Sequence, residues 1–225
     1  MKRSLPLLAL GLCLLSCASS PKPENSWWKG LSDTEANPED EALSCRGVRS
    51  GIELDQLASC WPPNAPALGF TDVRGLDEMS PVLRDCLLAG LPAITLEGED
   101  RARCQQGLAT VLSRRLYQLG WLKAGVKPLE DTGAAARTKL GVQLGQRYRV
   151  GELFVTTGPS QHVNSKKIIK KAQKAIPKRR WCTQTALEDI QTRVFDPSSF
   201  EHVAVSIGAL DDAAARASIL ITIQE

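Results

Sequence analysis

Two stretches of this chain follow one pattern at a separation of 79 residues: WLKAGVKPLEDTGAAARTKLGVQL at Trp121–Leu144 and FEHVAVSIGALDDAAARASILITI at Phe200–Ile223. Each opens on an aromatic residue, carries an Ala-Ala-Ala-Arg run and closes on alternating apolar residues. Alternation at a period of two is typical of a strand with one buried face. Each stretch therefore predicts two strands joined by a turn, near Glu130–Gly133 in the first copy and near Ala209–Asp212 in the second.

The repeat continues backward through two predicted helices in each copy. The second helix keeps the offset of 79, whereas the first helix has an offset of 85, because the loop between the helices is longer in the first copy. Each first helix begins beside a serine, Ser80 or Ser165, which is a favourable N-cap. A strand-like run that ends at Gly75 or Gly158 precedes it. The matched apolar pairs are Val126 and Val205, Leu108 and Leu187, Val111 and Ile190, Leu116 and Phe195, Leu83 and Ile168, and Leu91 and Ile176.

The order of these elements defines the fold class. Each copy reads strand, helix, helix, strand, strand, which is an α+β arrangement. We expect two tandem β-α-α-β-β modules, at 67–148 and 149–225, each a three-stranded sheet with two helices on one face. A matched order of five elements with matched core positions indicates a true duplication, and not only a recurrence of Ala-rich runs.

The N-terminus has the features of an exported lipoprotein. Two basic residues, Lys2 and Arg3, precede the apolar run LPLLALGLCLL, which is too short to span a membrane comfortably. The run ends in Leu-Leu-Ser-Cys at positions 14–17, which resembles a bacterial lipobox. The resemblance implies removal of residues 1–16 and acylation of Cys17 and of the new N-terminus, which holds the protein on a bilayer. Because Ala18 stands where an Asp would signal inner-membrane retention, we expect the outer membrane, with the protein facing the periplasm.

Residues 17–66 are expected to form a flexible tether. The segment from Ala18 to Ala42 is rich in Ser, Pro, Asn and acidic residues and shows no periodicity. Trp27 and Trp28 interrupt it, either as a local packing anchor or as an interfacial or partner-docking pair. The net charge is +3 before the signal peptide is removed. It is near +1 afterwards, because Lys2 and Arg3 are removed, and so small a charge argues against nucleic acid as a partner.

The cysteines predict disulfides. Cys45, Cys60, Cys86 and Cys104 are the candidates, because the periplasm is an oxidising compartment. One arrangement joins Cys45 to Cys60 in a small loop and Cys86 to Cys104 between the two helices of the first copy, and it leaves Cys182 free and buried. The other pairings of the four stay open, since spacing alone does not fix connectivity.

The module pattern resembles the POTRA (polypeptide-transport-associated) family, which consists of tandem β-α-α-β-β modules. The resemblance covers roughly Leu68 to Glu225. Two departures are the PSQHVNS segment after Gly158, which is longer than usual, and PKRRWC, which replaces a glycine-plus-tyrosine signature between the helices of the second copy. The similar motifs are Leu116-Tyr117 followed by Gly120-Trp121 and Ala124-Gly125-Val126, the junction Gly145-Gln146-Arg147-Tyr148-Arg149-Val150-Gly151, the trio Phe200, Val203 and Val205, and the terminal Glu225.

The resemblance implies that the modules bind other proteins. POTRA arrays precede a membrane β-barrel in outer-membrane assembly and translocation factors, and the second strand of each module is the expected open edge. An extended client can add to such an edge as a further strand. In this chain the edges fall at Leu122–Pro128 and Glu201–Ile207, and the candidate binding residues are Lys123, Val126, Val203 and Val205. Because the sequence leaves no room for a barrel after the second copy, we expect the lipid anchor to replace it.

We therefore expect a lipid-anchored periplasmic scaffold that assists the assembly or transport of outer-membrane β-barrel proteins. Its partners would be barrel-assembly or translocation proteins and unfolded barrel clients. The alternative is a structural envelope lipoprotein that docks a secretion or cell-surface complex. The sequence offers no nucleophile–base pair, no paired carboxylates and no phosphate loop, so we expect no enzyme activity, cofactor or small-molecule substrate. No cysteine spacing suits zinc, and His162 and His202 lie far from most cysteines, so no metal is expected.

A basic run marks the first helix of the second copy. Like charges four residues apart weaken a helix, so the run has a small stability cost. It is either a solvated face or a contact for anionic headgroups or an acidic partner. The cations are Lys166, Lys167, Lys170, Lys171, Lys174, Lys178, Arg179 and Arg180.

Overall fold

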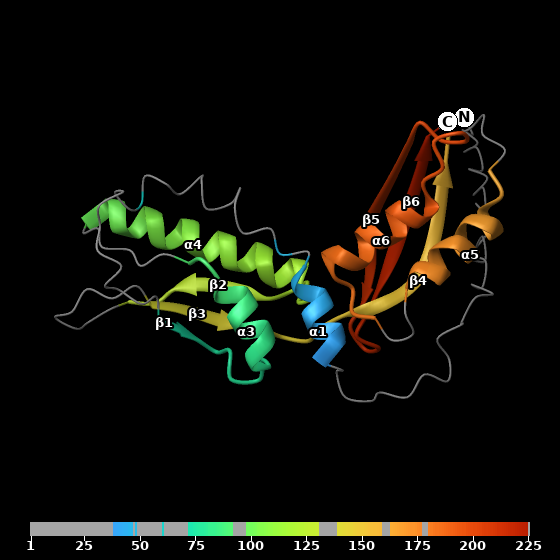
Figure 1. The fold of residues 1–225 in the computed structure, drawn as a ribbon. Helices are drawn as coiled ribbons and strands as arrows, with labels where there is room; N and C mark the ends of the chain where they lie inside the picture. The colour runs from blue at the N-terminus through green and yellow to red at the C-terminus, as the bar shows by residue number, and fades with distance from the viewer. Residues whose placement is uncertain are drawn as a thin grey trace, which may run out of the picture.

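The computed structural model describes residues 38–46, 48, 60, 72–91, 98–130, 139–158, 163–176 and 180–224. Its helices and strands follow one another along the chain in the order that the repeat predicts, and one additional helix precedes them in the sequence (Figure 1). The elements are α1 (Pro38–Cys45), β1 (Asp72–Arg74), α3 (Pro81–Leu88), α4 (Gly98–Gln118), β2 (Gly125–Pro128), β3 (Lys139–Gln143), β4 (Arg149–Thr157), α5 (Ser165–Ala175), α6 (Gln184–Val194), β5 (His202–Asp211) and β6 (Arg216–Gln224).

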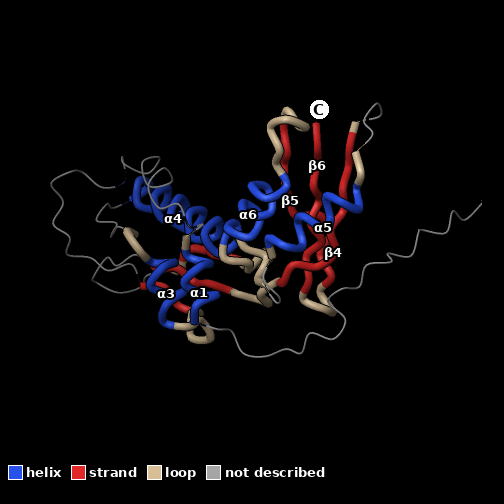
Figure 2. The backbone as a smooth tube through the Cα atoms, turned by 45° about the vertical axis from the view of Figure 1, so that its right-hand side comes forward, coloured by secondary structure: helices blue, strands red, loops and turns tan. Residues whose placement is uncertain are grey.

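The described strands form two sheets of three strands each. Their orders are β1-β3-β2 and β4-β6-β5, so the last strand of each module lies in the centre. The first strand pairs with it in parallel and the second strand pairs with it antiparallel. Two helices cover one face of each sheet, as Figures 1 and 2 show. The expected fold class of two β-α-α-β-β modules is therefore confirmed.

The pairing register repeats at the offset seen in the sequence. Val126 of β2 lies opposite Val142 of β3, and Val205 of β5 lies opposite Ile221 of β6. Both members of the second pair stand 79 positions after their counterparts. Because a slip of one residue would turn every side chain to the other face, the conserved register keeps the same positions in the two cores.

The first helix of each module also buries matching positions. Leu83 and Leu87 of α3 are buried, as are Ile168 and Ala172 of α5, and each pair is separated by the offset of 85. These residues stand one helical turn apart, so they form a stripe that packs on the sheet. The core of each module is closed by this stripe, the second helix and the inward face of the sheet.

Some local predictions need correction. Ser80 is the N-cap of α3, as expected, but Asn164 caps α5 with its side chain, which makes Ser165 the first helical residue. Phe195 is 43% exposed, whereas its expected counterpart Leu116 is fully buried. The reason is that α6 ends at Val194, so Phe195 caps the helix and does not continue its buried stripe.

The hairpin turns also differ from expectation. β5 continues through Asp211, and the turn occupies residues 212–215, where Ala215 has a positive φ of 49°. The predicted turn therefore starts too early, since the strand extends past the bulge between Ile207 and Leu210. Most of the turn expected near Glu130–Gly133 lies outside the described residues.

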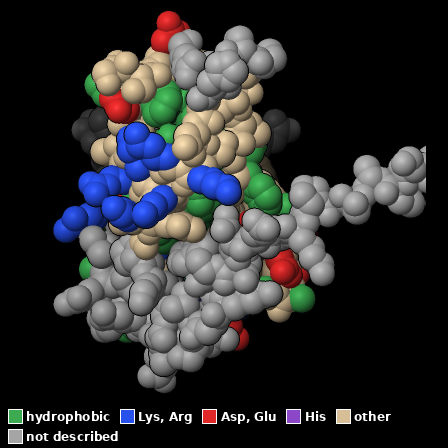
Figure 3. Space-filling model, turned by 90° about the vertical axis from the view of Figure 1, so that its right-hand side faces the viewer, with side chains coloured by type: hydrophobic (Ala, Val, Ile, Leu, Met, Phe, Trp, Pro, Cys, Tyr) green, Lys and Arg blue, Asp and Glu red, His purple; other side chains and the backbone are tan. Residues whose placement is uncertain are grey.

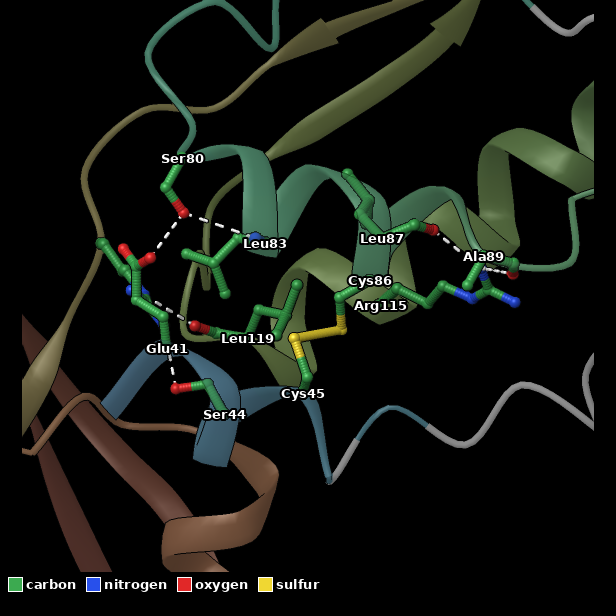
Figure 4. The surroundings of a disulfide bond; sticks show 11 residues. Glu41, Ser44, Cys45, Ser80, Leu83, Cys86, Leu87, Ala89, Arg115 and Leu119 are labelled. Carbon is green, nitrogen blue, oxygen red and sulfur yellow. Dashed lines mark hydrogen bonds between the residues drawn. A yellow bond between two sulfur atoms is a disulfide. The ribbon is translucent and has the colours of Figure 1, made fainter. Parts of the chain in front are cut away.

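Helix α1 lies within the segment expected to be a tether. The two disulfides bind this segment to module 1, and they join Cys45 to Cys86 and Cys60 to Cys104. The pairing of Cys45 with Cys60 and of Cys86 with Cys104 is therefore wrong. The reason is that α1 packs against α3, which brings the Cα atoms of Cys45 and Cys86 within 5.9 Å (Figure 4). Ser80 also donates a hydrogen bond to Glu41 of α1 at 2.6 Å.

The described helices include none that is both long and apolar enough to cross a membrane.

Candidate functional site

The sheet order leaves β2 and β5 at open edges, as expected, with β1 and β4 at the opposite edges. An edge strand presents unpaired N–H and C=O groups to solvent, and a partner strand can bind them. The four edges differ in length: β1 has 3 residues, β2 has 4, β4 has 9 and β5 has 10. Module 2 therefore offers the two long edges.

The start of β4 is already covered by the segment between α5 and α6. Val150 donates its N–H to the Arg180 carbonyl at 3.1 Å, and Cys182 donates to the Tyr148 carbonyl at 2.8 Å. Between these two contacts, Trp181 and Arg149 form an antiparallel β-bridge through their backbones. These contacts occupy the backbone groups that a partner strand would need, so β5 is the longer of the accessible edges.

One contact shows which backbone groups of β5 face outward. Gln191 of α6 donates from its side-chain amide to the Val203 carbonyl at 2.8 Å. In an antiparallel edge strand, alternate residues direct their backbone groups away from the neighbouring strand. By this alternation Val205 and Ile207 direct their N–H and C=O groups outward as well, up to the bulge after Ile207.

The four candidate edge residues have different positions. Val203 is 1% exposed and belongs to the core, so its side chain is not available, and its carbonyl already accepts from Gln191. Val205 and Val126 are partly buried on the helix-covered face of their edge strands. Lys123 precedes β2, and its ammonium pairs with Asp212 of module 2. Lys123 is therefore a contact between the modules and not an edge residue.

The outer face of each sheet carries a hollow. One of about 500 Å³ crosses the sheet of module 1, with Gly125 and Gly141 in its lining beside Arg74 and Lys127. The other, of about 280 Å³, includes Phe154, Leu210, Glu152 and Arg216 in its lining. Phe154 is 46% exposed and lies opposite Leu220 on the central strand. The second hollow therefore places exposed apolar side chains on the outer face of the module 2 sheet.

The basic run divides into described and undescribed parts. Helix α5 carries five of the eight cations, and Lys178 and Arg179 lie outside the described residues. Arg180 forms an ion pair with Asp189, and the ammonium of Lys171 lies 3.9 Å from Asp196. Lys166, Lys167, Lys170 and Lys174 are exposed on the helix.

The two modules meet at Asp212, in the β5–β6 turn. Its carboxylate accepts hydrogen bonds from the ammonium of Lys123 and from the Tyr148 hydroxyl, the latter at 2.5 Å. Gln146 donates to its backbone carbonyl at 2.9 Å. The Lys123 ammonium, and to a smaller extent the Tyr148 hydroxyl, hold the pKa of this carboxyl below its usual range. The hydrogen bond to Asp212 in turn raises the pKa of Lys123.

A second set of contacts at the junction surrounds Arg147. Its guanidinium lies 4.7 Å from the Trp121 ring centre and 4.6 Å from that of Trp181, one from each module. It also donates to the Leu119 carbonyl at 2.9 Å and to Ser44 of α1 at 3.2 Å. Cation–π contacts on two sides fix the planar group between the modules.

Sequence reasoning identified the junction segment but missed Asp212 and the role of Arg147. The available signal was Tyr148 in that segment, because a tyrosine that is buried needs a partner for its hydroxyl. The structure shows that Tyr148 is fully buried. The identity of the partner depends on the fold, since Asp212 is 64 residues away in sequence.

Other predicted residues stand as follows. Cys17, Trp27, Trp28 and His162 lie outside the described residues. Cys182 is free and buried, and desolvation raises the pKa of its thiol to about 12. The described part of the chain shows no group of three or more His, Cys, Asp or Glu side chains that could hold a metal ion.

No family model and no curated protein matches this chain. Solved structures match it at low identity. The POTRA3-5 segment of BamA from Haemophilus influenzae is 12% identical, with a TM-score of 0.43, over 72% of this chain and 69% of that chain. POTRA1-3 of the periplasmic domain of Omp85 from Anabaena is 15% identical, with a TM-score of 0.34, over 85% and 91%. CdiB from Escherichia coli is 11% identical, with a TM-score of 0.31, over 86% and 36%.

Proposed function

We propose that this protein is a lipid-anchored periplasmic scaffold that assists the assembly or transport of outer-membrane β-barrel proteins. It binds partners or clients by adding their strands to its sheet edges. The observation that carries the proposal is the ten-residue edge strand β5, whose outward backbone groups follow from the Gln191 contact. The duplicated β-α-α-β-β order and the POTRA-like motifs of the sequence support the same role.

Strand addition suits clients of varied sequence. Backbone hydrogen bonds supply the affinity, and they depend little on which side chains the client carries. Alternate side chains of the added strand then face either the helix layer or the outer face of the sheet. Unfolded barrel strands, which are extended and alternate in polarity, have the required form.

β5 is the principal edge and β2 the secondary one. A four-residue strand such as β2 offers few outward backbone groups. The first half of β5 offers the N–H and C=O groups of Val205 and Ile207, whereas the Val203 carbonyl is already occupied by Gln191. We expect the effect of blocking β5 to exceed that of blocking β2.

Site-specific photo-crosslinking in cells tests the edge. A photoreactive residue at Val205 should give adducts, and the same residue at Thr156, which is exposed on the opposite edge of the same sheet, should give few. Adducts to many nascent barrel proteins support the proposal. Adducts to one stoichiometric partner indicate the alternative, a structural lipoprotein that docks a larger complex. Equal labelling from both positions would contradict binding at β5.

A matched pair of variants tests the backbone. Val205→Pro removes the outward N–H group, and proline is tolerated at strand edges, whereas Val205→Thr keeps both the shape and the N–H. We expect the proline variant to lose most of its crosslinks from a reporter at Ile207, by about tenfold, while the threonine variant retains them. Thermal unfolding of both variants verifies that they are folded. Retained crosslinks in a folded Val205→Pro protein would rule out strand addition at this point.

The anchor has a separate test. Cys17→Ser removes the sulfur that the lipobox resemblance assigns to acylation. We expect this change to move the protein from the membrane fraction to the soluble fraction, because the variant lacks the acyl chains that would hold it on the bilayer. Unchanged membrane association of a variant that is exported and processed would contradict the anchor.

A further inference from the structure

Helix α5 separates its charged and apolar residues almost completely. At 100° per residue, Lys166, Lys167, Lys170, Lys171 and Lys174 occupy an arc of about 140°. The buried residues Ile168 and Ala172 lie on the other side, against the core. The lysines therefore form one continuous face, and Figure 3 shows Lys and Arg side chains gathered on the side of module 2 that carries this helix.

The charge of this face is not neutralised by the described part of the protein. Lys171 has Asp196 within 3.9 Å, but no described acidic residue forms an ion pair with Lys166, Lys167, Lys170 or Lys174. Neighbouring lysines at four-residue spacing repel one another and weaken the helix. Such a face gains most from an external negative charge.

We propose that the lysine face of α5 is a docking surface for the anionic headgroups of a phospholipid bilayer. The face is a convex helix surface made of lysines, and neither hollow in the described sheets includes a residue of α5. Protein–protein interfaces are depleted in Lys and centred on buried aromatic or apolar anchors, which this arc lacks. A headgroup layer has no such requirement, since it presents negative charge over an area and attracts clustered lysines without specific pairing.

The choice of a membrane rests on the lipid anchor of the proposed function, which keeps the protein near a bilayer. The arrangement of the lysines is independent of it. Helix α5 lies beside β4, whereas α6 lies beside β5 (Figures 1 and 2). A bilayer on the α5 side therefore leaves the β5 edge at the other side of the sheet, so lipid and client can bind together.

Vesicle binding of residues 18–225, which contain every described helix and strand, tests the proposal without the anchor. We expect binding to vesicles that mix phosphatidylcholine with phosphatidylglycerol, and little binding to phosphatidylcholine alone. Added salt should weaken it, because screening shortens the range of the charges. Replacing Lys166, Lys167, Lys170 and Lys174 by Gln should lower the affinity by about fivefold per lysine.

A control variant removes the same charge elsewhere. Arg46, Arg74, Lys127 and Arg193 are exposed and lie outside α5, and their replacement by Gln should change vesicle binding much less. Because the Lys→Gln changes relieve repulsion within α5, the test variant should melt no lower than the parent. Equal loss in the two variants, or binding that ignores phosphatidylglycerol, would overturn the proposal.

Polyglutamate tests whether an acidic protein, and not a bilayer, binds the lysine face. Tighter binding of soluble polyglutamate than of anionic vesicles at the same ionic strength, abolished by the α5 changes, would overturn the bilayer and indicate an acidic protein instead. Failure of any of these vesicle tests leaves the crosslinking result at Val205 unaffected, so the two proposals fail separately.

Discussion

Module 1 and module 2 share one topology but depend on different interactions. The described strands of module 1 have 3, 4 and 5 residues, whereas those of module 2 have 9, 10 and 9. Module 1 carries both disulfides, and the single described cysteine of module 2, Cys182, is free. Module 2 therefore has a long backbone ladder, whereas module 1 combines a short ladder with covalent cross-links.

A second difference lies at one position of the second helix. Arg115 of α4 is fully buried and donates to the Leu87 and Ala89 carbonyls at 2.7 and 2.8 Å (Figure 4). These carbonyls are at the end of α3, so the guanidinium caps that helix. The corresponding residue of module 2 is Val194, which is buried in an apolar core. Module 1 thus uses a buried cation where module 2 uses hydrophobic packing.

The largest expected effect comes from removing the disulfides. Each bond closes a loop of more than forty residues, since the cysteines are 41 and 44 positions apart. The chain-entropy model then gives a loss of about 4 kcal/mol for each bond removed. We expect Cys86→Ser combined with Cys104→Ser to lower the free energy of unfolding of module 1 and to leave module 2 close to the parent.

Hydrogen exchange resolved by peptide measures the two modules separately. Protection should fall in α3, α4 and β3 and persist in β4, β5 and β6. A reducing agent added to the unmodified protein should reproduce this pattern. Equal loss of protection in both modules would show that they unfold as one unit and would contradict the contrast between them.

The next effect concerns Arg115. Arg115→Val gives module 1 the residue that module 2 has, and it leaves the two α3 carbonyls without this donor. We expect a loss of about 2–3 kcal/mol in the free energy of unfolding, measured by denaturant titration. Arg114→Val, at the exposed neighbouring position, should change it by less than about 0.5 kcal/mol. A smaller effect at Arg115 than at Arg114 would show that capping by Arg115 is dispensable.

Much of this comparison could be predicted from the sequence because its signals are local and occur twice. The alternation of Val203, Val205 and Ile207 sets one face of a strand, and the offset of 79 places the same face in module 1. The serine at position 80 was recognisable as a cap because capping involves residues within one turn.

The remaining features depend on contacts between distant segments. The disulfide partners were mispredicted because they depend on where α1 packs, and the composition of that segment indicated a tether. Asp212 meets Lys123 across 89 residues, and no periodicity connects them. The basic run was visible, but which of its members form ion pairs depends on Asp189 and Asp196, which α6 and the following loop supply.

The smallest and most specific prediction concerns the junction at Asp212. Hydrogen bonds from Lys123 and Tyr148 lower the pKa of Asp212. The stabilisation that this carboxylate gives to the contact between the modules is therefore complete above the ordinary Asp value of about 3.9, and it is lost as the pH falls through the lower pKa of the folded state. The pKa of Lys123 is raised, so the same contact is complete below about 10.4 and is lost as the pH rises through the higher folded-state value. Between these limits the angle between the modules should not depend on pH.

Spin labels at Lys127 and Ser206, one in each module, measure this angle as a distribution of distances. Asp212→Asn should broaden the distribution at neutral pH as acid does in the parent. Asp211→Asn should leave it narrow, since Asp211 accepts only a local hydrogen bond from Ala214 among its described contacts. If Asp212→Asn leaves the distribution narrow, then the cation–π contacts of Arg147 with Trp121 and Trp181 suffice to hold the modules together. In that case the cation–π contacts of Arg147 would set the angle between the modules, and the hydrogen bonds of Asp212 would add little to it.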